Sequence, residues 1–88
     1  MKYKVDFLET QYSGGQKVIQ TIIYDDELDK IITNDVKWFD DLLWKGEFIT
    51  GKDGKEFSIK SNKLEFMKNL KYAFSGSMLR ATDIQKIV

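Results

Sequence analysis

The chain has 88 residues, of which 42% are hydrophobic and 14% aromatic, enough apolar surface for one small folded domain. Basic and acidic residues number 14 each, so the formal net charge is zero. Cys, His and Pro are absent, which excludes disulfides, Ser–His and Cys–His catalysis, and Pro-rich ligands. We therefore predict a single domain over residues 1–88 that is not an enzyme and that uses no metal and no cofactor.

The first two segments predict a β-hairpin. Residues 2–10 alternate apolar and polar side chains, and residues 17–24 are rich in β-branched residues. Gly14–Gly15 lies between them and suits a two-residue turn, because glycine tolerates positive φ. That turn would create these apolar pairs across the hairpin: Phe7 with Ile22, and Val5 with Tyr24.

The next segment, residues 26–45, predicts two consecutive helices. Asp26 suits an N-cap, and more acids follow in the first turn, where the helix dipole favours them. Asp35 would interrupt the apolar stripe, so we expect a break at residues 33–35 and a second helix that stops at Gly46. The stripe of both helices consists of Leu28, Ile31, Ile32, Val36, Trp38, Phe39, Leu42 and Leu43.

The C-terminal half predicts a second hairpin and a third helix. Asp53–Gly54 suits a type I′ turn. The strand pairs would then be Phe48 with Ile59 and Thr50 with Phe57. Residues 62–74 have helical apolar periodicity, and Asn62 suits the N-cap.

The end of the chain completes the predicted fold class. Residues 78–82 fit a strand, and the spacing of Ile84 and Ile87 fits a short terminal turn. The element order is then ββ-αα-ββ-α-β. We predict an α+β domain in which an antiparallel sheet of about four to five strands carries two to three helices on one face.

Acidic residues invite a metal or acid–base interpretation, which their spacing does not favour. The stretch "DDELD" at residues 25–29 lacks the glycine and spacing of a calcium loop, and a solvated first helical turn accounts for it. Asp40 and Asp41 would point about 100° apart on a helix, so they do not converge on one substrate atom.

Trp44 is the basis of the leading functional hypothesis. On the predicted helix it lies opposite the apolar stripe, near Lys37, Asp40 and Asp41. Either the following hairpin covers this tryptophan or a partner protein does. Residues 25–47 carry eight acids against three lysines, a net charge of −5 that would face a basic partner surface. We therefore expect a cytoplasmic protein-binding module, such as an inhibitor, adaptor or regulator, whose composition would suit a phage or mobile element of an AT-rich bacterium.

The alternative is a nucleic-acid-binding domain. Residues 48–88 carry eight basic groups against four acids, a net charge of +4. The candidate contacts are Lys68, Lys71, Tyr72 and Arg80, because lysines beside a tyrosine contact phosphate and stack on a base. Homodimerisation through a strand edge or Trp44 is a third hypothesis. No run of 18 apolar residues occurs, so we expect no membrane partner.

Overall fold

The computed structural model describes residues 1–33 and 48–87 of the chain. The second predicted helix, over residues 34–45, lies outside the described residues. In chain order the elements are β1 (Lys2–Thr10), β2 (Gln16–Asp25), β3 (Lys30–Thr33), β4 (Phe48–Thr50), the short 3-10 segment η2 (Lys52–Gly54), β5 (Glu56–Ser58), α2 (Lys63–Ala73), β6 (Leu79–Ala81) and β7 (Gln85–Ile87).

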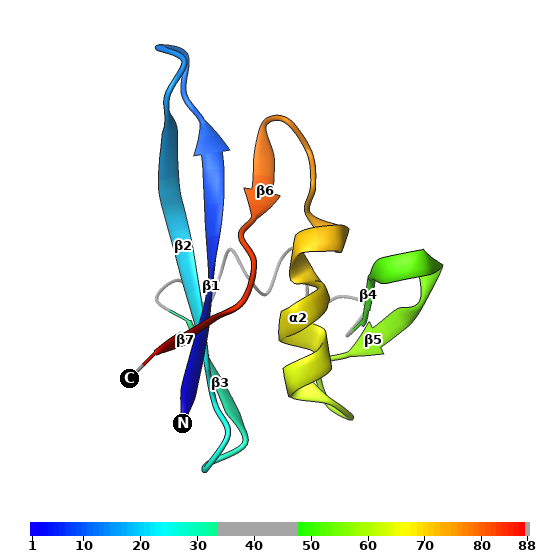
Figure 1. Cartoon of the computed structure of the whole chain (residues 1–88). Helices are drawn as coiled ribbons and strands as arrows, with labels where there is room; N and C mark the ends of the chain where they lie inside the picture. Colours follow the sequence, from blue (N-terminus) through cyan, green and yellow to red (C-terminus); the bar gives the residue numbers. More distant parts are fainter. Residues whose placement is uncertain (34–47, 88) are drawn as a thin grey trace.

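β1 is the central strand of a five-stranded antiparallel sheet. One edge of β1 pairs with β2, which pairs in turn with β3. The other edge is shared, because β6 pairs with residues 7–9 and β7 pairs with residues 2–4. The last two strands of the chain therefore follow one another along β1 (Figure 1).

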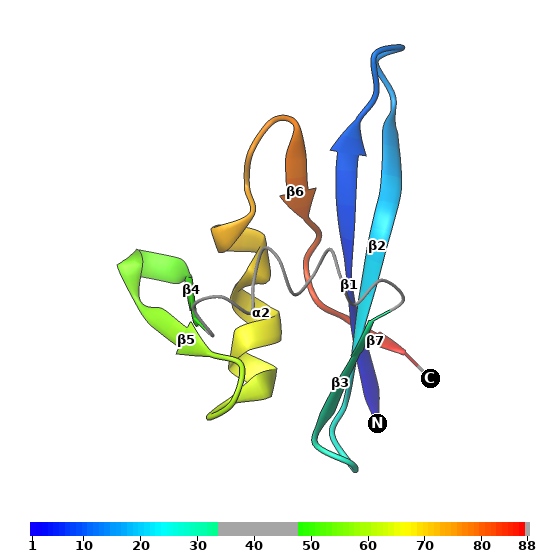
Figure 2. The same cartoon turned by 180° about the vertical axis from the view of Figure 1, so that it is seen from behind.

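The α2 helix lies between this sheet and a separate two-stranded sheet formed by β4 and β5. Figures 1 and 2 show the resulting order of sheet, helix and hairpin from opposite sides. α2 therefore packs on the five-stranded sheet with one side and on the β4–β5 hairpin with the other.

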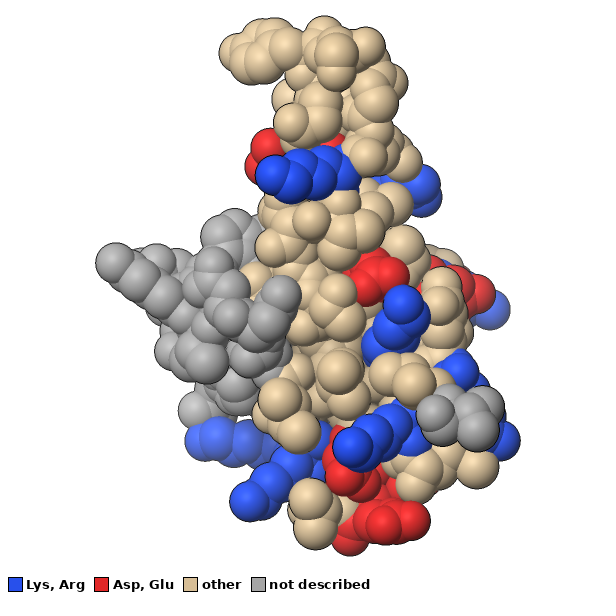
Figure 3. All heavy atoms as spheres, turned by 90° about the vertical axis from the view of Figure 1, so that its left-hand side faces the viewer, with Lys and Arg blue, Asp and Glu red and all other residues tan. Residues whose placement is uncertain are grey.

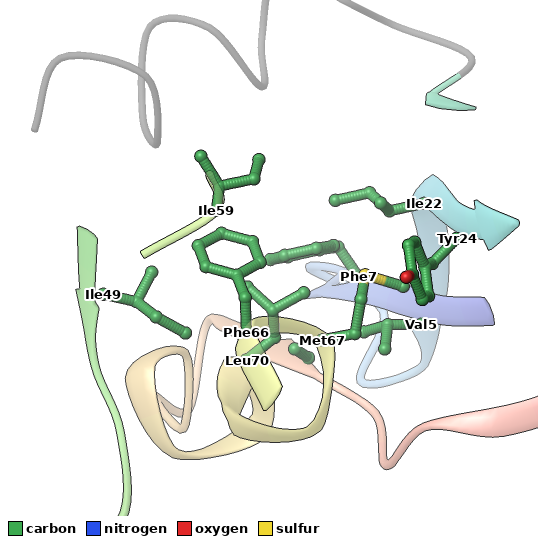
Figure 4. Close-up of a cluster of buried hydrophobic side chains, with 10 residues drawn as sticks. Val5, Phe7, Ile22, Tyr24, Ile49, Ile59, Phe66, Met67 and Leu70 are labelled. Carbon is green, nitrogen blue, oxygen red and sulfur yellow. The ribbon is translucent and has the colours of Figure 1, made fainter. Parts of the chain in front are cut away.

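The core fills the space between the five-stranded sheet and α2 (Figure 4). Alternation along a strand places every second side chain on one face, and residues three or four apart share one face of a helix. The fully or almost fully buried side chains are Val5, Phe7, Ile22, Tyr24, Ile49, Ile59, Phe66, Met67, Leu70 and Ala81. Ile49 and Ile59 come from the second hairpin and its exit, so they extend the core to the far side of α2.

The prediction of two to three helices on one face of a single sheet is wrong. The described residues form two sheets, one α-helix and the short η2 segment. The helix predicted to start at Asp26 is replaced by a turn and the strand β3. In that turn Asp25 Oδ1 accepts hydrogen bonds from the amides of Glu27 (3.0 Å) and Leu28 (3.4 Å). Such bonds from a side chain to nearby backbone compete with helix formation.

The first hairpin forms with a register different from the predicted one. Val5, rather than Phe7, lies opposite Ile22. The loop has three residues instead of two, since the Gln11 amide donates to the Gly15 carbonyl at 2.8 Å and Gly14 adopts φ of 90°. An irregularity between Phe7 and Leu8 moves the register again. At Phe7 the total shift is two residues, which leaves Val5, Phe7, Ile22 and Tyr24 on one inward face, as predicted.

The second hairpin has the predicted turn but a different strand register. Asp53 and Gly54 both have positive φ, as a type I′ turn requires, and the Lys55 amide donates to the Lys52 carbonyl at 3.2 Å. The strands are nevertheless offset by one residue, because Ile49 rather than Thr50 lies opposite Phe57. A one-residue shift exchanges the faces of a strand. Phe48, which the predicted register pairs with Ile59, is therefore 55% exposed, and Ile49 is 5% exposed.

The helix predicted at residues 62–74 is confirmed as α2. Asn62 Oδ1 accepts a hydrogen bond from the Glu65 amide at 3.2 Å, as expected of an N-cap. The strand predicted at residues 78–82 is confirmed as β6. The predicted terminal turn is wrong, because Gln85–Ile87 form β7 on the edge of β1 that β6 leaves open.

Candidate functional site

The residues of the leading hypothesis, Trp44, Lys37, Asp40 and Asp41, lie outside the described residues. Two hollows of the described surface differ in chemistry. One is apolar and lies at the end of the β1–β2 hairpin, and the other is lined by lysines beside α2.

The hairpin-end groove has a volume of about 570 Å³. Its lining residues are Glu9, Thr10, Gln11, Tyr12, Ile19, Met78 and Leu79. Two hydrogen bonds join its two walls: the Thr10 amide donates to the Met78 carbonyl at 2.9 Å, and the Thr10 hydroxyl donates to the Ser77 carbonyl at 2.6 Å. The segment before β6 is thereby fastened to the end of β1.

Large apolar side chains are exposed at this groove. Tyr12 is fully exposed and Met78 is 63% exposed. The hairpin loop carries no charge, and Figure 3 shows this end of the molecule as an uncharged projection with charged side chains beneath it. Contiguous exposed apolar surface of this kind is typical of an interaction site.

The second hollow, the lysine groove, has a volume of about 380 Å³ and lies between the η2 loop and α2. Four lysines line it: Lys52, Lys55, Lys68 and Lys71. Its aromatic residues are Phe57 and Tyr72, and its acids are Asp53, Glu65 and Asp83. Three of the four residues predicted for nucleic-acid contact are therefore brought together here, and Arg80 is not among them.

The η2 loop is held against α2 by Gly51 and Asn69. Asn69 is buried on the helix, and its Oδ1 accepts a hydrogen bond from the Lys52 amide at 3.1 Å. A Cβ atom on Gly51 would lie 2.6 Å from Asn69 Oδ1 and 2.7 Å from Phe57 Cε2, so only glycine fits between them. This close packing places the loop lysines beside those of the helix.

The helix lysines of the groove are already paired with acids. Lys71 Nζ lies 3.0 Å from Asp83 Oδ1, and this hydrogen bond raises the pKa of Lys71 and lowers the pKa of Asp83. Lys68 Nζ lies 3.4 Å from Glu65 Oε1. Within residues 1–33 and 48–87, Lys52 and Lys55 have no ion-pair partner.

Arg80 lies in a neighbouring hollow of about 320 Å³ that shares Lys71, Tyr72 and Asp83 with the lysine groove. Its guanidinium donates a hydrogen bond to Gln16 Oε1 at 2.9 Å. Tyr72 is 43% exposed at the junction of the two hollows, and Lys71 Nζ lies 5.2 Å from its ring centroid. The four predicted residues thus line two connected hollows.

Sequence reasoning did not identify the contribution of the η2 loop. The sequence places Lys52 and Lys55 beside the Asp53–Gly54 turn and assigns them no functional role. Gly51 is the sequence signal that could have indicated their role. The turn at Asp53–Gly54 does not require a glycine at position 51, so Gly51 points to a close contact with a neighbouring segment at that position.

The acidic stretch at residues 25–29 is used for internal contacts. Asp29 Oδ1 accepts a hydrogen bond from the Tyr24 hydroxyl at 2.9 Å, and Asp29 Oδ2 lies 3.2 Å from Lys63 Nζ at the start of α2. These contacts lower the pKa of Asp29, with the Tyr24 bond as the larger cause, and raise the pKa of Tyr24. In the part of the chain that the structure describes, no group of three or more acidic side chains is arranged to hold a metal ion.

Comparison with known proteins provides no further assignment. No protein-family model matches the chain, and no curated protein or solved structure is significantly similar to it. Among the described helices, none is long and apolar enough to cross a membrane.

Proposed function

We propose that this chain is a non-catalytic protein-binding module whose hairpin-end groove receives a bulky apolar side chain of a partner protein. The observation that carries the proposal is the full exposure of Tyr12 beside an apolar groove. In this proposal the partner is cytoplasmic, because a chain without cysteine is compatible with a reducing compartment. The module acts on that partner as an inhibitor, adaptor or regulator.

The apolar side chains of Tyr12 and Met78 remain in water and are available for burial by a partner. Burial of a side chain such as Met contributes about 1.5–3 kcal/mol, and tyrosine is enriched among the residues that dominate binding energy. Tyr12 and Met78 flank the groove from two different segments, so one inserted side chain would contact both. Ile19 and Leu79 line the same hollow and add apolar contact.

The charges around the groove describe the partner further. Glu9 lines the groove and lies opposite Lys17 across the hairpin, so these two charges offset one another beside it. We therefore expect the partner to be recognised mainly through an apolar side chain.

Site-specific photocrosslinking tests the proposal. A photoreactive phenylalanine analogue replaces Tyr12 in one variant and Leu28 in another, in cells of the native host. Leu28 is the matched control because it is 62% exposed but lies in the β2–β3 turn, at the opposite end of the sheet. We expect a defined protein adduct from position 12 and none from position 28.

Competition by unlabelled protein tests whether the crosslink reports specific binding at the groove. Excess unlabelled wild type and Leu28→Ala should suppress the adduct, whereas Tyr12→Ala/Met78→Ala should compete at least about 30-fold more weakly, as loss of a binding hot spot implies. Equal competition by this double variant would refute the proposed site. An adduct of two copies of this chain would replace the heterologous partner with a homodimer.

A further inference from the structure

We propose that the lysine groove is a second, independent binding site, and that its ligand is single-stranded nucleic acid with a base stacked on Tyr72. This function goes beyond the protein-binding role, since the two hollows share no lining residue.

The cations of the groove converge from two segments that are separate in sequence. Lys52 and Lys55 come from the η2 loop, and Lys68 and Lys71 come from α2. The Asn69 hydrogen bond and the tight packing at Gly51 hold these segments together before any ligand binds. A preorganised set of cations loses less freedom on binding than lysines on a mobile loop.

Tyr72 supplies the feature that distinguishes a nucleic acid from a simple anion. Its ring is partly exposed between the two hollows, and the Lys71 ammonium group lies over one face of the ring, so a base would stack on the other face. An exposed aromatic ring next to cations can stack on a base while the cations contact the adjoining phosphates. Stacking requires an unpaired base, which favours a single strand over a duplex.

The extent of the surface favours a strand over a mononucleotide. The lysine groove continues past Tyr72 into the hollow that contains Arg80, with Lys71 and Tyr72 common to both. The two connected hollows therefore give a strand room on both sides of the stacking ring. The Arg80 guanidinium is not counted among the phosphate contacts, because Gln16 Oε1 already holds it at 2.9 Å.

The acids of the groove limit the affinity. Phosphates must replace Glu65 at Lys68 and Asp83 at Lys71, although both ion pairs are solvent-exposed and such pairs are weak. Lys52 and Lys55 need no such exchange. We therefore expect sequence-independent binding with a Kd of about 1–100 µM at physiological salt.

Fluorescence anisotropy with labelled oligothymidine and oligouridine of about 10 nucleotides tests the inference. If all four lysines contact phosphate, a rise in salt from about 50 to about 200 mM should weaken binding about 50-fold. Binding of both oligomers, or of oligouridine alone, supports the site and shows whether the ribose hydroxyl contributes. Absence of binding at low salt, or equally tight binding of a duplex, would overturn it.

Variants separate the phosphate contacts from the stacking contact. Lys52→Ala/Lys55→Ala should reduce the same salt effect to about 7-fold, whereas Lys17→Ala/Lys30→Ala, which removes equal charge elsewhere on the sheet, should preserve it. Tyr72→Ala should weaken binding about 5- to 150-fold, and Tyr72→Phe should retain it. If the sheet pair has the same effect as the loop pair, or if Tyr72→Ala binds like wild type, the inference fails.

Discussion

Gly51→Ala should destabilise the protein by displacing the η2 loop from α2. The added Cβ would lie 2.6 Å from Asn69 Oδ1 and 2.7 Å from both Asn69 Cβ and Phe57 Cε2, distances that real Cβ atoms essentially never show. Asn69 cannot retreat easily, because it is buried and its side-chain amide also donates to the Glu65 carbonyl at 2.8 Å. The loop must therefore move.

The expected cost has two parts. Overpacking at a well-packed contact costs about 1–3 kcal/mol, and loss of the hydrogen bond from the Lys52 amide to Asn69 adds about 0.5–1.5 kcal/mol. The free energy of unfolding should fall by about 1.5–4.5 kcal/mol. For a domain of this size, that corresponds to a decrease in Tm of about 6–36 °C.

Urea unfolding followed by far-UV circular dichroism measures this effect, and Gly15→Ala is the matched control. A Cβ at Gly15 meets no atom within 4 Å, so the alanine should be neutral or slightly stabilising through its effect on the unfolded chain. If Gly51→Ala unfolds within about 0.5 kcal/mol of wild type, the loop is not packed on α2 as described. The same result would remove the structural basis for the convergence of the four groove lysines.

Two further predictions concern the turn after β2 and the register of the second hairpin. Hydrogen bonds, chiefly from Tyr24 and then from Lys63, lower the pKa of Asp29 below its usual 3.8. The Asp29 carboxylate therefore stabilises the fold above that pH, and this stabilisation is lost as the pH falls through the lowered pKa. Asp29→Asn should therefore reduce the free energy of unfolding near neutral pH and by less below pH 3.8; a difference that stays constant in urea titrations across this range would contradict the assignment. Ile49→Ala should cost about 2–5 kcal/mol and Phe48→Ala under about 1 kcal/mol, and the reverse order would favour the register predicted from the sequence.

Local signals in the sequence located most of the described secondary structure. The alternation in residues 2–10 and the β-branched run in residues 17–24 correspond to β1 and β2, and the capping signal at Asn62 marks the start of α2. The inward-facing apolar side chains of the first hairpin, Val5, Phe7, Ile22 and Tyr24, were also predicted correctly. A register shift of two residues preserves the faces of a strand. These features depend on interactions within a hairpin or a single helix.

The error at residues 26–33 arose because two structures use the same residues. Acids after Tyr24 suit the first turn of a helix, but they equally suit a turn in which an Asp side chain binds nearby amides. The pairing of Ile31 with Tyr24 and of Ile32 with Ile23 decides between them. That pairing depends on the neighbouring strand, although the consecutive β-branched residues of β3 were a signal in its favour.

The register of the second hairpin could not be read from its turn alone. The type I′ turn at Asp53–Gly54 is present, yet one extra residue beside it exchanges the faces of β4. The exchange allows Ile49 to reach the core beside α2 and leaves Phe48 outside. The helix that selects this arrangement begins only after the hairpin ends, so the selection is a tertiary effect.

The two proposed binding surfaces are tertiary in the same sense. The hairpin-end groove exists because Thr10 holds the Met78 carbonyl, and the lysine groove exists because Asn69 holds the η2 loop. The two surfaces are connected by α2 and by the segment that leads from α2 to β6. The buried residues of α2 belong to the single core on which both surfaces rest. No contiguous motif encodes either surface, because each combines segments that meet only in the folded chain: β6 with β1 in the hairpin-end groove, and the η2 loop with α2 in the lysine groove. A search for functional motifs along the chain therefore finds part of the lysine groove, namely Lys68, Lys71 and Tyr72. It misses Lys52 and Lys55 of the same groove and the whole of the hairpin-end groove.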